Sequence, residues 1–264
     1  MNRIDALFAQ KRKEGKTALL LYVTAGFPDL KTTEALIPVL EKAGADLIEI
    51  GVPFSDPIAD GPTIQKASSL SLKAGATLKK IIDTIRALRR KTQVPLLLFS
   101  SYNPVLKYDP EKLIRDASGA GVDGILLPDL PPEEADRVIA LCERARISHV
   151  FLIAPTTPPD RAEKIVKESS GFIYYVSTKG VTGARDKLDR SISAHVAQLR
   201  KLTDKPICVG FGISKPEHAK SLKGKVAGIV VGSALIREIE AGKTREDRLE
   251  RAAQFTRNLA RALE

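Results

Sequence analysis

The amino-acid sequence predicts a (β/α)8 barrel, the TIM-barrel architecture, with one extra N-terminal helix. Eight short apolar runs alternate with helical patterns along the chain, and several of these runs are apolar nearly throughout. Such runs are typical of parallel strands that are covered on both faces. The 264 residues suit one barrel domain spanning 1–264, because no linker divides them. A doubly wound open sheet is the alternative, but it would need fewer strands or a further domain.

The elements are expected in a regular order. A helical pattern over residues 2–14 comes first and is expected to cover the bottom of the barrel. The predicted strands start at Ala18, Asp46, Pro95, Asp123, His149, Phe172, Pro206 and Val226. Helical patterns cover 32–44, 78–91, 110–121, 132–145 and 159–171, and glycine or a polar turn follows many of them. The interval between the second and third strands is the longest, and it begins at a carboxyl strand end, where barrel enzymes usually carry function.

Composition and charge exclude several classes of protein. The net charge of +10 invites a nucleic-acid interpretation, but lysine and arginine are mixed with acids, as in residues 246–264. No apolar run approaches the length of a membrane span, and no secretory signal pattern is present. Two cysteines, Cys142 and Cys208, suit reduced core thiols. These features predict a cytoplasmic protein that binds neither nucleic acid nor membrane.

Two acids stand out after the second strand. Glu49 lies near the carboxyl end of an apolar strand and shares one face with Leu47 and Gly51. In a barrel this face lines the mouth, where partial desolvation raises the pKa of a carboxyl group and suits it for proton transfer. Asp60, in the following loop, could return over the same mouth. The alternative is a structural glutamate paired with a buried arginine or lysine.

Two glycine-rich strand ends near the C-terminus predict a phosphate cradle. They are residues 210–214, GFGIS, and residues 231–236, VGSALI, and each precedes a helical pattern. Backbone N–H groups at a helix N-terminus bind phosphate, and barrels frequently place this site after strands seven and eight. Glycine also ends many strands for steric reasons, so each motif has a purely structural alternative.

The loop after the sixth strand could close over a substrate. Residues 177–185, STKGVTGAR, combine two glycines, small polar residues and two basic groups; an ordinary flexible surface loop is the alternative. The three histidines, His149, His195 and His218, have no metal-ligand spacing, so no metal site is expected. The strand runs contain no interior lysine, which disfavours imine chemistry.

Several stretches together resemble one family, the alpha subunit of tryptophan synthase. They are residues 22–29, 48–65, 102–104, 126–134, 180–185, 209–214 and 230–236, in family order and over nearly the whole chain. The most specific is PFSDPIADGP within 48–65. One departure is Ser101, where many relatives have tyrosine.

The resemblance implies a retro-aldol lyase that cleaves indole-3-glycerol phosphate to indole and glyceraldehyde 3-phosphate. Glu49 matches the catalytic glutamate, and Asp60 matches the aspartate that accepts the indole N–H. Substrate-binding positions are matched by Tyr22, Ile64, Leu126, Tyr174 and the lid residue Thr182, and phosphate-binding positions by Gly183, Gly212, Gly232 and Ser233, with Gly210 and Phe211 supporting the turn.

The resemblance also implies a partner. The alpha subunit docks on a beta subunit in an α2β2 heterotetramer, and the beta subunit carries pyridoxal phosphate and receives indole. This chain itself is expected to bind no cofactor. Pro53, Asp56 and Pro57 are expected at the subunit interface.

Three other functions remain as alternatives. The first is a catalytically silent subunit that only activates its partner, which intact Glu49 and Asp60 disfavour. The second is another phosphate-binding barrel, such as an isomerase of histidine or tryptophan synthesis, whose paired acids or Cys–Asp pair are not found here. A basic nucleic-acid-binding protein is the third, and the charge distribution disfavours it.

Overall fold

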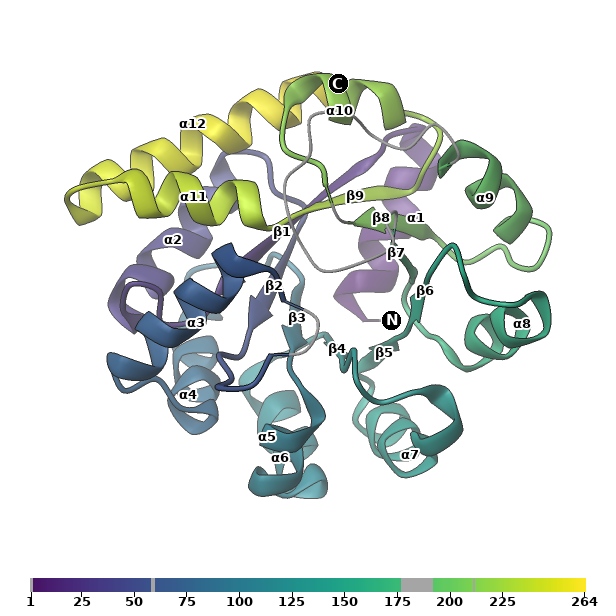
Figure 1. Ribbon diagram of the computed structural model, residues 1–264, viewed down its shortest axis with the longest axis horizontal. Helices are drawn as coiled ribbons and strands as arrows, with labels where there is room; N and C mark the ends of the chain where they lie inside the picture. The colour runs from purple at the N-terminus through teal and green to yellow at the C-terminus, as the bar shows by residue number, and fades with distance from the viewer. Residues whose placement is uncertain (1, 58–59, 177–191, 211) are drawn as a thin grey trace.

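The computed structural model describes residues 2–57, 60–176, 192–210 and 212–264, and its parallel strands form a barrel surrounded by helices (Figure 1). The strand order is β5-β4-β3-β2-β1-β9-β8-β7-β6, and all neighbours are parallel. The segments β5 and β6 lie on either side of Phe151 and pair with opposite neighbours. They are therefore two halves of the fifth barrel strand, and the (β/α)8 prediction is confirmed.

Each of the eight barrel strands begins within two residues of its predicted start. Their bounds are β1 (Ala18–Thr24), β2 (Leu47–Gly51), β3 (Leu96–Phe99), β4 (Gly124–Leu126), β5 (Ser148–Val150), β6 (Leu152–Ile153), β7 (Ile173–Val176), β8 (Ile207–Gly210) and β9 (Gly228–Val231). Every residue of β1 and β2 is buried, because one face packs inside the barrel and the other against helices. The parallel register places Tyr22 of β1 opposite Glu49 of β2.

Helices cover the outside of the barrel. Their bounds are α1 (Arg3–Glu14), α2 (Leu30–Lys42), α3 (Pro62–Lys73), α4 (Leu78–Leu88), α5 (Tyr102–Tyr108), α6 (Pro110–Ala120), α7 (Asp136–Ala145), α8 (Pro159–Glu168), α9 (Ile192–Leu199), α10 (Pro216–Leu222), α11 (Ser233–Ala241) and α12 (Arg245–Leu263). Side-chain caps stabilise the N-termini of several of these helices. Asp29 accepts the Thr32 N–H before α2, and Thr77 accepts the Lys80 N–H before α4. The helix α4 then buries an isoleucine- and leucine-rich stripe at helical spacing.

Two of the predicted elements are divided in the structure. The fifth strand is interrupted at Phe151, although its carbonyl still accepts the Tyr174 N–H at 3.2 Å. The helix predicted over 132–145 begins instead as a separate 3-10 turn, η1 (Pro132–Glu134), and α7 follows after Ala135. The ring of Pro132 removes a backbone donor and favours the start of a turn here.

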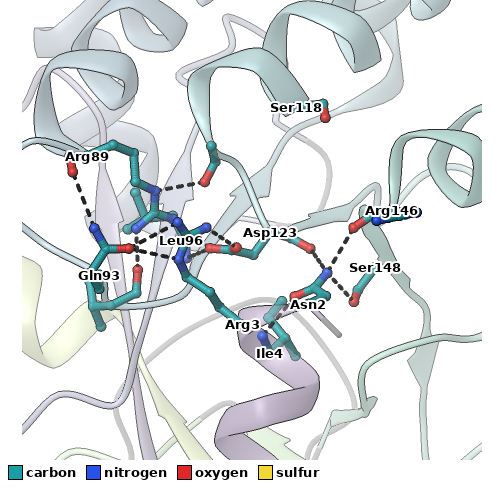
Figure 2. Close-up of polar contacts among 12 residues, drawn as sticks. Asn2, Arg3, Ile4, Arg89, Gln93, Leu96, Ser118, Asp123, Arg146 and Ser148 are labelled. Atoms are coloured by element: carbon teal, nitrogen blue, oxygen red, sulfur yellow. Dashed lines mark hydrogen bonds and ion pairs between the residues drawn. The ribbon is translucent and has the colours of Figure 1, made fainter.

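The predicted N-terminal helix is confirmed as α1, which lies across the bottom of the barrel. Its Ile4 and Phe8 join the interior cluster, which also holds Leu47, Leu126 and Tyr174. A polar junction fixes this end (Figure 2). Asn2 donates to the Asp123 carbonyl and to Ser148 Oγ, and the buried Asp123 carboxylate accepts bonds from Arg3, Arg89 and the Leu96 N–H. The bottom of the barrel is thus closed, and its open end is the one at which the strands have their carboxyl ends.

Candidate active site

Glu49 occupies the middle of β2, and its carboxyl group is the most unusual polar group in the barrel. The residue is 1% exposed, and neither carboxylate oxygen has a hydrogen-bond partner in the described part of the chain. Burial raises the pKa of Glu49 to about 8. A buried acid without a structural partner is expensive for folding, so this position favours chemistry over a structural ion pair.

Tyr22 borders Glu49 on the neighbouring strand. Its ring lies over Gly51 so closely that an added Cβ there would overlap the ring and hydroxyl. Phe99 of β3 meets the same ring edge-on, with ring centroids 5.6 Å apart and an interplanar angle of 86°. Burial, followed by the negative charges of Asp60 and then Glu49, raises the pKa of the Tyr22 hydroxyl. Tyr22 is therefore within electrostatic range of both acids.

Asp60 lies in the loop between β2 and α3 and is half-buried. Desolvation raises the pKa of its carboxyl group to about 6. Its backbone carbonyl accepts a 2.8 Å hydrogen bond from Gln65 Nε2 in α3, which ties the end of the loop to the helix. The sequence expectation that Asp60 returns toward the mouth agrees with its electrostatic effect on Tyr22.

Tyr174 and Leu126 face the barrel interior, and Ile64 is buried in the first turn of α3. The ring of Tyr174 lies over Gly210 of the next strand, repeating the arrangement of Tyr22 over Gly51. After burial itself, the charge of Glu49 is the largest cause of the raised pKa of Tyr174. Tyr22 and Tyr174 thus both lie within electrostatic range of Glu49.

The candidate phosphate groups lie at the ends of β8 and β9. Gly212 has a φ of 86°, a left-handed conformation that glycine adopts without strain. Gly232 precedes α11, whose N-terminus has no side-chain cap, and Ser233 is its first residue. The first N–H groups of that helix therefore remain available for an anion. A Cβ on Gly232 would lie 3.3 Å from Cβ of Tyr22, so this end adjoins the aromatic mouth.

Thr182, Gly183 and Phe211 lie outside the described residues, and so does the whole 177–185 loop. Of the three expected interface residues, Asp56 is exposed, Pro57 is half-buried and Pro53 is buried. Asp56 and Pro57 border a groove of about 390 Å³, whose far wall is formed by Gln65, Ser69, Leu72 and Lys73 of α3. The side chain of Leu72 is partly exposed on this wall.

Sequence patterns do not predict three contacts made by residues of the barrel strands and of the loops that follow them. Phe99 supports Tyr22, Cys208 lies buried within electrostatic range of Glu49, and the Asp129 carboxylate accepts the Tyr102 N–H at the start of α5. Strand alternation could have placed Phe99 and Cys208 inside the barrel, but Asp129 has no local signal.

Within the described ranges, no group of three or more potential ligands is placed to hold a metal ion. Nor does any described helix combine the length and apolar content needed to cross a membrane.

Known proteins match this chain along nearly its full length. Residues 8–264 match the family model for the tryptophan synthase alpha chain. The tryptophan synthase alpha chain of Geotalea daltonii is 52% identical over 240 residues, covering 91% of each chain. That of Caldanaerobacter subterraneus subsp. tengcongensis is 42% identical over 263 residues, covering 100% of each.

Solved structures agree in fold. The Mycobacterium tuberculosis tryptophan synthase structure aligns with a TM-score of 0.92 at 33% identity, covering 99% of this chain and 98% of that one. The tryptophan synthase subunit alpha of Legionella pneumophila also aligns with a TM-score of 0.92, at 34% identity, over 100% of this chain and 98% of its own. With a family match over almost all residues and a barrel mouth built around two acids, the chain belongs to the tryptophan synthase alpha chain family and is a lyase of tryptophan biosynthesis.

Proposed function

We propose that this chain cleaves indole-3-glycerol phosphate to indole and glyceraldehyde 3-phosphate, with Glu49 transferring the protons. The observation that carries the proposal is the Glu49 carboxyl group, which is buried, has no partner among the described residues and has a pKa of about 8. At neutral pH this group is mostly protonated and can act first as an acid.

The proton balance of the reaction fits one carboxyl group. The Glu49 acid gives its proton to C3 of the indole ring, and the ring becomes a cation. The Glu49 carboxylate then removes the proton from the adjacent side-chain hydroxyl. The C–C bond breaks, its electron pair returns to the ring, and indole and the aldehyde form. Glu49 ends protonated, as it began, so the cycle needs no further acid or base.

Asp60 is proposed to stabilise the positive ring. Its pKa of about 6 leaves it mainly ionised at neutral pH, so it can accept the indole N–H and offset the developing charge. Tyr22, Ile64, Leu126 and Tyr174 would form the apolar walls around the ring, which agrees with their burial. The two acids thus have different roles because burial raises their pKa values to different levels.

Gly212, Gly232 and Ser233 are proposed to hold the substrate phosphate, with Gly183 as a further contributor. The uncapped N-terminus of α11 supports this assignment, because its N–H groups and helix dipole favour an anion. Thr182 is proposed to orient Asp60 when the loop closes. Within the described residues, no lysine is buried that could form an imine with substrate, which agrees with direct proton-transfer chemistry.

An alpha chain of tryptophan synthase works in a complex with a beta subunit. We infer an α2β2 heterotetramer in the cytoplasm, with this chain forming one domain over 1–264. Pyridoxal phosphate would reside in the beta subunit, where indole is consumed. Pro53, Asp56 and Pro57 are proposed to contribute to the interface. The exposed Asp56 and the adjoining groove support that location.

The Glu49→Gln variant tests the proposal. Indole release from indole-3-glycerol phosphate is measured for wild type and variant, with and without the beta subunit. We expect a loss of at least about 10²-fold, because the amide cannot exchange the protons. Phosphate binding should remain, because the amide keeps the size of the carboxyl group and Glu49 is not one of the proposed phosphate-binding residues. The matched control is Glu34→Gln, whose carboxylate makes only a surface pair with Lys91.

Two outcomes would contradict the assignment. Undiminished indole release by the Glu49→Gln variant would remove Glu49 from the mechanism. A wild-type chain that releases no indole, yet stimulates the beta subunit, would instead be the silent activating subunit.

A further inference from the structure

A second cavity lies on the surface beside α1, next to the closed bottom of the barrel and at the opposite end from Glu49. It has a volume of about 510 Å³. Its walls are the C-terminal end of α1, the segment between α9 and β8, and the segment between α10 and β9. In Figure 1, α1 lies behind β7 and β8. Contact is shown by the ring centroids of Phe8 in α1 and Phe172 before β7, which are 5.5 Å apart, and Phe8 lines the cavity together with Ile207 of β8. A volume of this size is within the range of small-molecule sites.

The cavity is strongly basic. Its lining contains five cationic side chains and a single carboxylate: Lys11, Arg12, Lys16, Arg200, Lys205 and Asp204. Two of these cations make side-chain hydrogen bonds to neutral oxygens: Arg12 donates to the Asp204 carbonyl oxygen, and Lys205 donates to the carbonyl oxygens of Val166 and Ser169. Neither forms an ion pair within the described part of the chain, although Glu168 lies within electrostatic range of Lys205. Those bonds to neutral oxygens also hold the walls in place.

Arg200 and Lys16 are free to bind an anion. Arg200 is exposed and forms no ion pair or side-chain hydrogen bond within the described part of the chain. Lys16 pairs at 3.0 Å with Glu14, and both side chains are solvent-accessible. Surface pairs of this kind contribute little, so Lys16 can turn toward a ligand at small cost. Lys11 is more fixed, because it pairs with Asp46 at 2.7 Å.

Apolar side chains also contribute to the lining of the cavity. Phe8, Ile207 and Val226 line it and are almost fully buried. A lining that combines several cations with apolar side chains fits a molecule with a charged group at one end and a flat or apolar body at the other. Guanidinium and ammonium groups bind phosphate through charge-assisted hydrogen bonds.

We propose that this basic cavity is a binding site for a small organic phosphate. Arg200 and Lys16 bind the phosphate group, Arg12 and Lys205 add positive charge, and Phe8, Ile207 and Val226 contact the apolar body. The site is separate from the phosphate-binding glycines, which lie at the carboxyl ends of β8 and β9, whereas this cavity adjoins their amino ends.

The test is a titration of the full chain with adenosine monophosphate, followed by amide NMR. The amides of Gly15 and Gly224 report on the basic cavity, and that of Gly232 reports on the active site. We expect saturable shifts at Gly15 and Gly224, and none with adenosine, which lacks the phosphate. The site-resolved readout separates this binding from any occupancy of the active site.

Variants connect the binding to the named cations. Arg200→Gln and Lys16→Gln should each weaken adenosine monophosphate binding at the cavity by at least about fivefold, because each removes a charge-assisted contact. The matched control is Lys201→Gln, an exposed neighbour that does not line the cavity and should leave binding within about twofold. Absence of saturable shifts at Gly15 and Gly224, equal binding of adenosine, or an equal loss in the Lys201 variant would each overturn the proposal.

Discussion

At the residue scale, the two mouth carboxyl groups differ in how far burial moves their pKa. Glu49 is enclosed by the barrel and has a pKa of about 8, whereas the half-buried Asp60 has a pKa of about 6. Desolvation disfavours the charged form of each, and it acts more strongly on the more enclosed group. At pH values between about 6 and about 8, the Glu49 carboxyl group is mainly protonated while that of Asp60 is mainly ionised. This is the combination that the proposed mechanism requires.

The rate should therefore depend on pH in a bell shape. As pH rises through about 6, Asp60 ionises and kcat/KM for indole-3-glycerol phosphate should rise. As pH rises through about 8, Glu49 loses its proton and kcat/KM should fall. The measurement is initial-rate kinetics from pH 5 to pH 9 in buffers of constant ionic strength.

The Asp60→Asn variant is the control for this assignment. It should be much slower and should lose the acidic limb while keeping the basic limb. A wild-type rate that keeps rising above pH 8 would contradict the role of the protonated Glu49.

At the scale of elements, the mouth depends on how closely neighbouring strands approach one another. Tyr22 of β1 and Tyr174 of β7 each cover a glycine of the adjacent strand, Gly51 and Gly210. A side chain at either glycine would occupy the space that the ring fills. These glycines therefore set the ring positions, and the rings in turn form walls around Glu49.

Replacing Gly51 with alanine should disturb catalysis more than folding. The added Cβ would overlap the Tyr22 ring, so the ring must move away from its place beside Glu49. We expect kcat/KM to fall at least about tenfold, with destabilisation of about 1–3 kcal/mol typical of overpacking. Kinetics and urea unfolding measure the two effects.

Gly119→Ala is the matched control, because a Cβ on this glycine in α6 meets nothing within 4 Å. It should leave kcat/KM unchanged and stabilise the helix slightly. If Gly51→Ala kept wild-type kinetics, the ring position would not limit the reaction.

At the scale of the whole molecule, one buried carboxylate joins four elements at the closed end of the barrel. Asp123, which is 5% exposed, precedes β4 and accepts bonds from Arg3 of α1, from Arg89 after α4, and from the Leu96 N–H of β3 (Figure 2). The Asp123 carbonyl also accepts a bond from Asn2. This junction holds segments that are far apart in the sequence.

The Asp123→Asn variant should lose about 3 kcal/mol of unfolding free energy, because Arg89 is left partly buried without its counter-charge. Its kcat should stay near wild type, because the junction lies at the opposite end from Glu49. Urea unfolding and indole release measure the two quantities.

Arg3→Gln is the companion variant. Arg3 pairs with the same carboxylate but is 41% exposed, so its loss should cost less than about 1 kcal/mol. Equal destabilisation by the two variants would contradict the burial argument.

Local patterns were sufficient for much of this protein. Alternating apolar runs and helical stripes predicted the barrel and α1. The reason is that burial on one or both faces of an element produces a regular spacing of apolar residues along the sequence. These patterns do not predict the interruption of the fifth strand at Phe151, which depends on how its two halves pair with neighbouring strands. Nor do they predict the break between η1 and α7 at Ala135, which follows two consecutive prolines. Local patterns predict Asp123 only as the start of a strand, because its hydrogen-bond partners lie 27 to 121 residues away.

The sequence by itself determined the barrel, the family and the position of Glu49 on an inward face, since strand alternation and motif order are local properties. Only the tertiary structure decided that Glu49 has no partner in the described chain, that Tyr22 and Tyr174 cover glycines beside it, and that five cations converge on a basic cavity below. The physical reason is that desolvation, ring placement and charge convergence depend on which distant segments the closed barrel brings together.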